Sequence, residues 1–97
     1  MRLINIYLKH RDDALLGEVA VRYATLLRQT FGSRVLGPER PMVARVQNLY
    51  IRQVVMKVET QASMSKVKAI LRQLYEQMLE LDGRMKSVRL YYDVDPM

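Results

Sequence analysis

The spacing of hydrophobic residues switches between two periods along this chain, and this switching constrains the fold more than any other feature. Residues 2–9 and 86–94 place apolar side chains at every second position, which is typical of half-buried strands. From Asp12 to Phe31 and from Ser63 to Asp82 the spacing is instead three and four residues, as in an amphipathic helix. The chain therefore begins and ends with a strand and contains two long helices.

The segment between the two helices has the composition of a pair of strands. Residues 42–47 and 50–59 are both strand-like, and Asn48-Leu49 between them is a candidate tight turn. Before this pair, Leu36-Gly37-Pro38 and Pro41 predict a kinked entry, because proline and glycine interrupt regular backbone.

The resulting order is strand, helix, strand, strand, helix, strand. Two right-handed crossover units of this kind predict a ferredoxin-like α+β sandwich, a βαββαβ fold in which two helices cover one face of a four-stranded antiparallel sheet. With 97 residues and no linker or repeat, residues 1–97 are expected to form a single domain.

Composition favours a basic protein of a reducing compartment. Sixteen Lys and Arg residues stand against ten Asp and Glu, so the net charge is +6, which suits a polyanionic partner such as nucleic acid or an acidic peptide. The chain has no cysteine, which excludes disulfides and thiol catalysis. It has no signal-peptide pattern and no apolar run near the roughly 20 residues that span a bilayer. We therefore expect a cytoplasmic location and no membrane partner.

The alternation of the strands also predicts which side chains the helices leave uncovered. If Ile4, Ile6, Val54, Met56, Leu90 and Tyr92 face the helices, the opposite face carries Asn5, Tyr7, Lys9, Arg45, Gln53, Lys57, Arg89, Tyr91 and Asp93. Bases can stack on tyrosine while cations neutralise phosphates, so Tyr7, Lys9, Arg45, Lys57, Arg89 and Tyr91 are candidate nucleic-acid contacts.

Other interpretations of this face remain open. RNA-recognition domains share the same order of elements, but their glycine-rich aromatic signature is absent, with Val55 and Lys57 in the corresponding strand. Exposed tyrosine and lysine could also serve only to keep an open sheet soluble, or the face could pack against a neighbouring domain.

The start of the second helix is a second candidate site. Ser65, Lys66 and Lys68, with Ser63 and the free backbone N–H groups of the first turn, could bind a carboxylate or a phosphate. The alternative is an ordinary solvated helix end.

No residue set predicts catalysis or a metal site. Asp93 and Asp95 share one side of the last strand without a third ligand nearby, which favours a structural role, and His10 is expected to be a solvated loop residue. Acylphosphatases of similar fold bind phosphate after the first strand. Here that loop, residues 10–13, lacks glycine, and Asp12 and Asp13 would repel an anion.

Three short stretches carry a family resemblance. They are Leu36-Gly37-Pro38, Tyr50 to Gln53 at the start of an apolar strand that ends at Lys57, and Asp93-Val94-Asp95-Pro96. In this order and spacing they resemble the C-terminal domain of the primosomal replication-restart helicases (PriA, or primosomal protein N′), and Val46 to Arg52 is similar to the form found in Bacteroidetes. Many members carry aromatic-Arg-aromatic-Gln at the second stretch, whereas here Ile51 and Arg52 occupy the middle positions. This shift moves the charge to the other face of the strand.

The resemblance implies a role in primosome assembly and replication restart. Family members are ATP-dependent 3′–5′ DNA helicases, but their phosphate loop, acidic box and zinc cysteines are absent here. The resemblance therefore implies an excised, non-catalytic domain, with ATP and zinc bound only by other parts of the parent.

The implied partners are single-stranded or fork DNA, other helicase domains and the single-stranded DNA-binding protein, whose acidic tail ends in a free carboxylate. Ser65-Lys66-Val67-Lys68 is similar to a Ser-Arg-Val-Arg stretch of other members, which supports the anion site. A purely structural packing module and a ribosomal-protein-like RNA binder remain the alternatives.

Overall fold

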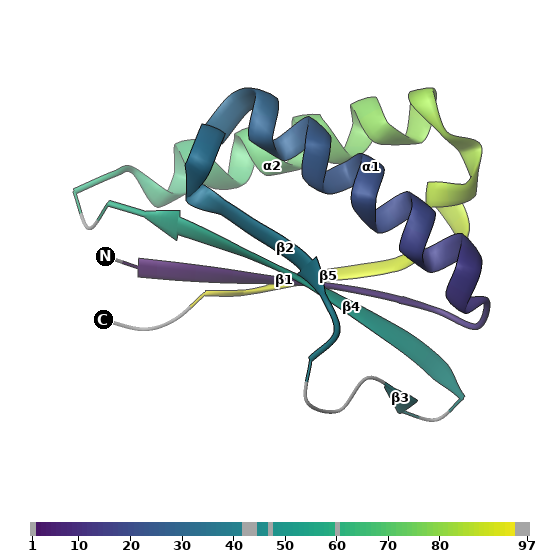
Figure 1. Cartoon of the computed structure of the whole chain (residues 1–97). Coiled ribbons are helices and arrows are strands. Elements are labelled where there is room, and N and C mark those ends of the chain that lie inside the picture. The colour runs from purple at the N-terminus through teal and green to yellow at the C-terminus, as the bar shows by residue number, and fades with distance from the viewer. Residues whose placement is uncertain (1, 42–44, 47, 60, 95–97) are drawn as a thin grey trace.

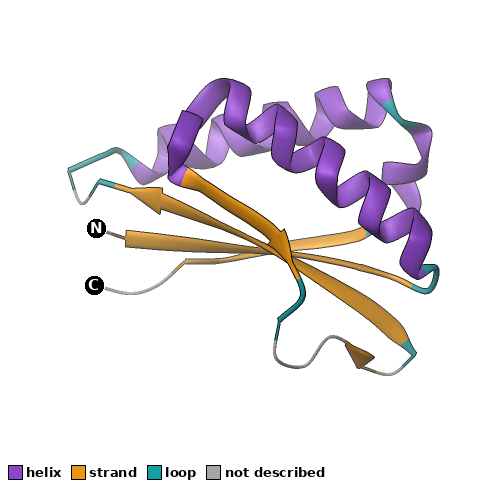
Figure 2. Cartoon of the chain, in the orientation of Figure 1, coloured by secondary structure: helices purple, strands orange, loops and turns teal. Residues whose placement is uncertain are grey.

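A computed structural model describes residues 2–41, 45–46, 48–59 and 61–94. Two helices form one layer and a twisted sheet forms the other (Figures 1 and 2). In chain order the elements are β1 (Arg2–His10), α1 (Asp13–Phe31), η1 (Gly32–Arg34), β2 (Val35–Glu39), β3 (Arg45–Val46), β4 (Leu49–Val58), α2 (Met64–Leu81), η2 (Gly83–Ser87) and β5 (Arg89–Val94).

The sheet order is β2-β4-β1-β5, and β3 pairs with β4 beyond β2. Every pairing is antiparallel. Each helix connects two strands that have one strand between them, so the chain contains two interleaved crossovers. This arrangement confirms the predicted α+β fold of the ferredoxin-like type, with both helices on one face of the sheet (Figure 1).

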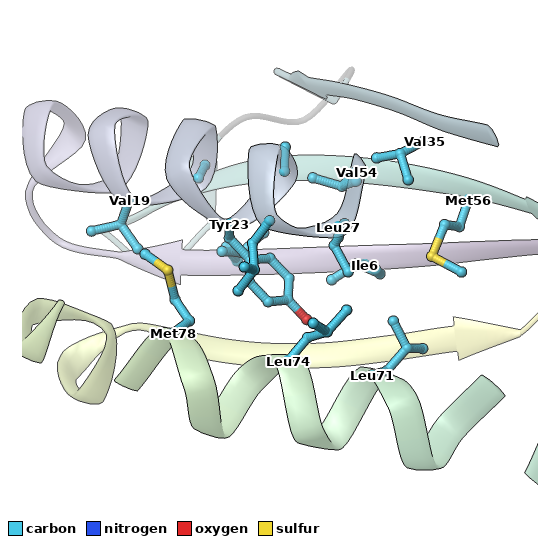
Figure 3. Close-up of a cluster of buried hydrophobic side chains, with 14 of the residues drawn as sticks. Ile6, Val19, Tyr23, Leu27, Val35, Val54, Met56, Leu71, Leu74 and Met78 are labelled. Atoms are coloured by element: carbon cyan, nitrogen blue, oxygen red, sulfur yellow. The ribbon is translucent and has the colours of Figure 1, made fainter. Parts of the chain in front are cut away.

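The core lies between the helices and the sheet, and the alternation read from the sequence determines which strand residues enter it. Ile4, Ile6 and Leu8 of β1 are fully buried, and they pair with Met56, Val54 and Arg52 of β4. Figure 3 shows Ile6, Val54 and Met56 of the sheet meeting Val19, Tyr23 and Leu27 of α1 and Leu71, Leu74 and Met78 of α2. Burial raises the pKa of Tyr23 well above its ordinary value, so its hydroxyl stays neutral beside that of Tyr92, 3.3 Å away.

Local signals explain where the helices begin and end. The Asp12 carboxylate accepts a hydrogen bond from Leu15 N at the start of α1, and Gly32 ends that helix with a φ of 68°. The Ser63 hydroxyl accepts from Lys66 N at the start of α2. In the described part of the chain, neither helix combines the length and hydropathy needed to cross a membrane.

The second strand differs from the prediction. Regular pairing begins at Val35, so Leu36 to Pro38 lies inside β2 instead of forming an entry to a strand at 42–47. Of that predicted strand, only Arg45–Val46 pairs with β4 among the described residues. The register shifts between Leu36 and Glu39, where Gly37 has a φ of 104°, so a bulge conceals the strand from a search for period two.

The last strand also starts later than predicted. Residues 83–87 form the 3₁₀ helix η2, which Asp82 caps by accepting a hydrogen bond from Arg84 N. The strand then runs from Arg89 to Val94. Asp95, which was expected to share a structural role with Asp93, and Pro96 lie outside the described residues.

Candidate nucleic-acid interface

The face of the sheet opposite the helices carries most of the residues expected there. Tyr7 of β1 pairs with Gln53 of β4 on one side and with Tyr91 of β5 on the other. Strand residues in directly opposed pairs point to the same face. The same register places Asn5, Lys9, Lys57, Arg89 and Asp93 on this open face.

Two tyrosines form the centre of this face. The rings of Tyr7 and Tyr91 stack with their centroids 5.1 Å apart and an interplanar angle of 25°. Lys9 Nζ lies 5.0 Å from the centroid of the Tyr91 ring. Tyr91 is 43% exposed, so a large part of its surface is open to a ligand. We call Tyr7, Tyr91 and Lys9 the tyrosine platform.

Two polar residues of the open face next to the tyrosine platform form a hydrogen bond with each other. Gln53 Nε2 donates a hydrogen bond to Asn5 Oδ1 at 3.0 Å. Leu36 and Val55 are paired farther toward the β2 edge, and Leu36 is largely exposed. The open face is therefore cationic and aromatic over β1 and β5, and toward β2 it carries exposed Leu36 and Glu39.

One predicted contact is described only in its backbone. Arg45 of β3 pairs with Tyr50 of β4, and the turn between them contains Asn48, whose φ is 65°. The side chain of Arg45 lies outside the described structure, so its place on the open face stays a prediction.

The second predicted site lies at the start of α2, which follows the Val58 end of β4, whereas Tyr7 pairs with Gln53 nearer the middle of that strand. Lys66 and Lys68 are exposed. The Ser63 hydroxyl already accepts from Lys66 N and lies 3.1 Å from the Ser65 hydroxyl. The cap therefore uses one of the N–H groups that an anion would need, and Ser65 lies against Ser63.

Arg52 has a structural position that sequence reasoning left undecided. It faces the helices, its side chain is 10% exposed, and its guanidinium donates to Asp13 Oδ1 at 2.5 Å and to the Ile51 carbonyl at 3.2 Å. Arg40 contacts the other oxygen of Asp13 at 3.2 Å. Arg52 therefore anchors the first turn of α1 to β4, and the shift of charge noted in the sequence does move it off the open face.

A second ion-pair network surrounds Asp82, which the sequence indicated only as a helix end. Its buried carboxylate accepts from Arg22 Nη1 and Arg84 Nη2, both at 2.8 Å, and Arg84 also reaches Glu18 at 2.6 Å. The hydrogen bonds from Arg84, followed by that from Arg22, hold the pKa of Asp82 well below its usual range. No local pattern reveals this network, because its members are up to 66 residues apart.

The described residues include no group of three His, Asp or Glu side chains that could hold a metal ion. His10, expected to be a solvated loop residue, is the last residue of β1 and links two segments: its Nδ1 accepts from Asp12 N at 2.9 Å and its Nε2 lies 3.0 Å from Ser87 Oγ. The chain matches no protein-family model, and no curated protein is significantly similar to it.

Proposed function

We propose that this chain is a non-catalytic domain that binds single-stranded nucleic acid on the open face of its sheet. The observation that carries this proposal is the tyrosine platform, two stacked rings with a lysine ammonium over one of them, on a face that no helix covers. Base stacking on an aromatic side chain contributes about 1–3 kcal/mol per base and tolerates any sequence.

The surrounding cations support the same function. Lys9, Lys57 and Arg89 lie on the open face with Tyr7 and Tyr91, so phosphates could be neutralised on both sides of a stacked base. The overall charge of +6 favours such a partner at long range.

We further propose that the bound nucleic acid is DNA and that the domain belongs to a replication-restart helicase of the primosomal type in the cytoplasm. The support is the order and spacing of the three sequence stretches that resemble this family, together with a fold of the expected class. In this role the domain would hold DNA, and it would dock to the single-stranded DNA-binding protein through Ser65, Lys66 and Lys68.

Fluorescence anisotropy with labelled single-stranded and fork DNA, measured across a salt series, tests the binding function. We expect micromolar or tighter affinity with a steep salt dependence, because several counterions are released. Absence of binding at low salt would contradict the proposal and favour a structural packing module. A preference for RNA over DNA of equal length would favour the RNA-binding alternative.

A double variant tests the platform itself. Tyr7→Ala with Tyr91→Ala should weaken single-strand binding by about tenfold or more without changing the salt slope, because stacking involves no counterion. The matched control, Tyr7→Phe with Tyr91→Phe, keeps both rings and should bind almost as well as the native chain. Equal affinity of the alanine variant and the native chain would exclude the tyrosine platform as the binding surface.

A further inference from the structure

A basic recess opens where β1 ends and β5 begins, directly beside the tyrosine platform. Its volume is about 360 Å³, within the roughly 300–1,000 Å³ of small-molecule sites. The residues that line it are Lys9, His10, Arg11, Leu49, Ser87 and Arg89. Three of these six are permanent cations and none is a carboxylate, so an anion is the ligand that its charge suits.

Two of the cations that line the recess lie directly opposite each other in the sheet. Lys9 and Arg89 are directly opposed in the β1–β5 pair, and like charges at such positions destabilise a sheet. Among the residues that the structure describes, neither these two nor Arg11 forms an ion pair. A bound anion would relieve this repulsion.

A second arginine-rich depression provides the contrast. It lies beside α1, has a volume of about 740 Å³, and is lined in part by Arg22, Arg40, Arg52 and Arg84. Every one of those arginines pairs with Asp13, Glu18 or Asp82. The arginines of that depression are therefore compensated by carboxylates, whereas the cations of the basic recess are not.

Hydrogen bonds hold the recess in shape. The Asp12 N–H can only donate, so His10 Nδ1 must accept and the ring proton is on Nε2. Nε2 then donates to Ser87 Oγ at 3.0 Å, while the Ser87 hydroxyl donates to the Arg84 carbonyl at 2.8 Å. The turn that carries Arg11 is thus fixed to the segment before β5, and a preorganised site loses less entropy on binding.

The two aspartates that follow Arg11 are turned away from the recess. Asp12 caps α1 through its bond from Leu15 N, and Asp13 binds Arg40 and Arg52. Neither lines the recess. The carboxylates of this loop therefore contribute no group to the lining of the recess.

We propose that the basic recess binds a phosphate group of the nucleic-acid strand whose neighbouring base stacks on Tyr91. This inference rests on the proposed function and extends it from a stacking surface to a defined phosphate site. Lys9 belongs to both, since its ammonium lies over the Tyr91 ring and lines the recess. Arg11 and Arg89 supply planar guanidinium groups, which bind phosphate oxygens in pairs.

The first experiment uses the only histidine of the chain as a probe. Inorganic phosphate is titrated into the folded protein and followed by NMR, with sodium chloride at matched ionic strength as the control. We expect saturable shifts of the His10 ring signals and of the amides of Arg11, Ser87 and Arg89, and their loss in the Arg11→Ala, Arg89→Ala variant. Shifts that match those of chloride, or that persist in the variant, would overturn the proposal.

The second experiment uses oligonucleotides and Arg11→Ala, because Arg11 lines the recess without belonging to the platform. The variant should bind single-stranded DNA several-fold more weakly, with a salt slope reduced by about 0.7. Arg40→Ala, in the paired depression, is the matched control and should bind like the native chain. A larger loss with a terminally phosphorylated strand assigns the recess to a terminal phosphate, and equal losses assign it to an internal phosphodiester.

Different results would contradict the phosphate site in the recess and the proposed nucleic-acid-binding function. If the native chain binds DNA and Arg11→Ala binds it equally well, the phosphate site is overturned and the platform stands. If the native chain binds no DNA, the proposed function fails, and a titration with no saturable phosphate shift would reject the recess as well.

Discussion

At the scale of single residues, Gly37 has the most restricted position of the four glycines. Its φ is 104°, and a Cβ at this position would lie 2.8 Å from the Gln53 carbonyl oxygen of the neighbouring strand. We therefore expect Gly37→Ala to lower the free energy of unfolding by about 2 kcal/mol or more, measured by urea denaturation. The matched control is Gly83→Ala, because Gly83 has no atom within 4 Å of an added Cβ. Equal stability of the two variants would contradict the assignment of Gly37 as a required glycine.

The ionisation of Asp82 should make the stability of the fold depend on pH. Its carboxyl pKa is lowered in the folded state, so its contribution to stability is fully present above the unfolded value of about 3.9 and is lost as pH falls below it. Asp82→Asn should be less stable than the native chain at pH 6. The difference in unfolding free energy between this variant and the native chain should shrink steadily below about pH 4. At those pH values the Asp82 carboxylate of the native sequence becomes protonated in the unfolded state. Urea midpoints between pH 6 and pH 2 measure this, and a difference independent of pH would contradict it.

At the scale of elements, the attachment of α1 to the sheet depends on Arg52. Its guanidinium joins β4 to the first helical turn through Asp13, and it is mostly buried. Arg52→Met keeps much of the packing but removes the charged hydrogen bonds, so we expect a loss of about 1–3 kcal/mol in unfolding free energy. Arg34→Met is the control, because its pair with Glu59 is exposed on both sides. Hydrogen exchange should increase first in the N-terminal turn of α1, and an unchanged rate there would contradict the anchoring role.

The elements themselves were predictable where the hydrophobic period is clean. Both helices, β1, β4 and the open face follow from spacings of two and of three to four residues. The β2 strand was missed because a glycine bulge interrupts its alternation, and the start of β5 because η2 has no periodic signature. Contacts such as His10 with Ser87, 77 residues apart, depend on the assembled topology and have no local signal.

At the scale of the whole molecule, the arginines beside α1 differ from the cations at the end of the open face in whether carboxylates pair with them. The described arginines beside α1 are mostly paired with carboxylates, whereas the cations at the end of the open face are not. We therefore expect nucleic acid to approach the open face and not the side of α1, although exposed cations of α2 such as Lys66, Lys68 and Arg72 also contribute to the net charge of +6. Nonspecific attraction to total charge would make no such distinction.

A matched pair of variants distinguishes binding along the open face from nonspecific attraction to the total charge. Arg89→Ala on β5 and Arg72→Ala on α2 each remove one positive charge from an exposed arginine. If phosphates bind along the open face, Arg89→Ala should weaken single-strand binding several-fold and reduce the salt slope by about 0.7, whereas Arg72→Ala should change neither. Anisotropy titrations of both variants at three or more salt concentrations, on one oligonucleotide, give the comparison. Equal losses of affinity in the two variants would mean that binding responds to net charge alone. This result would contradict the assignment of the open face as the interface.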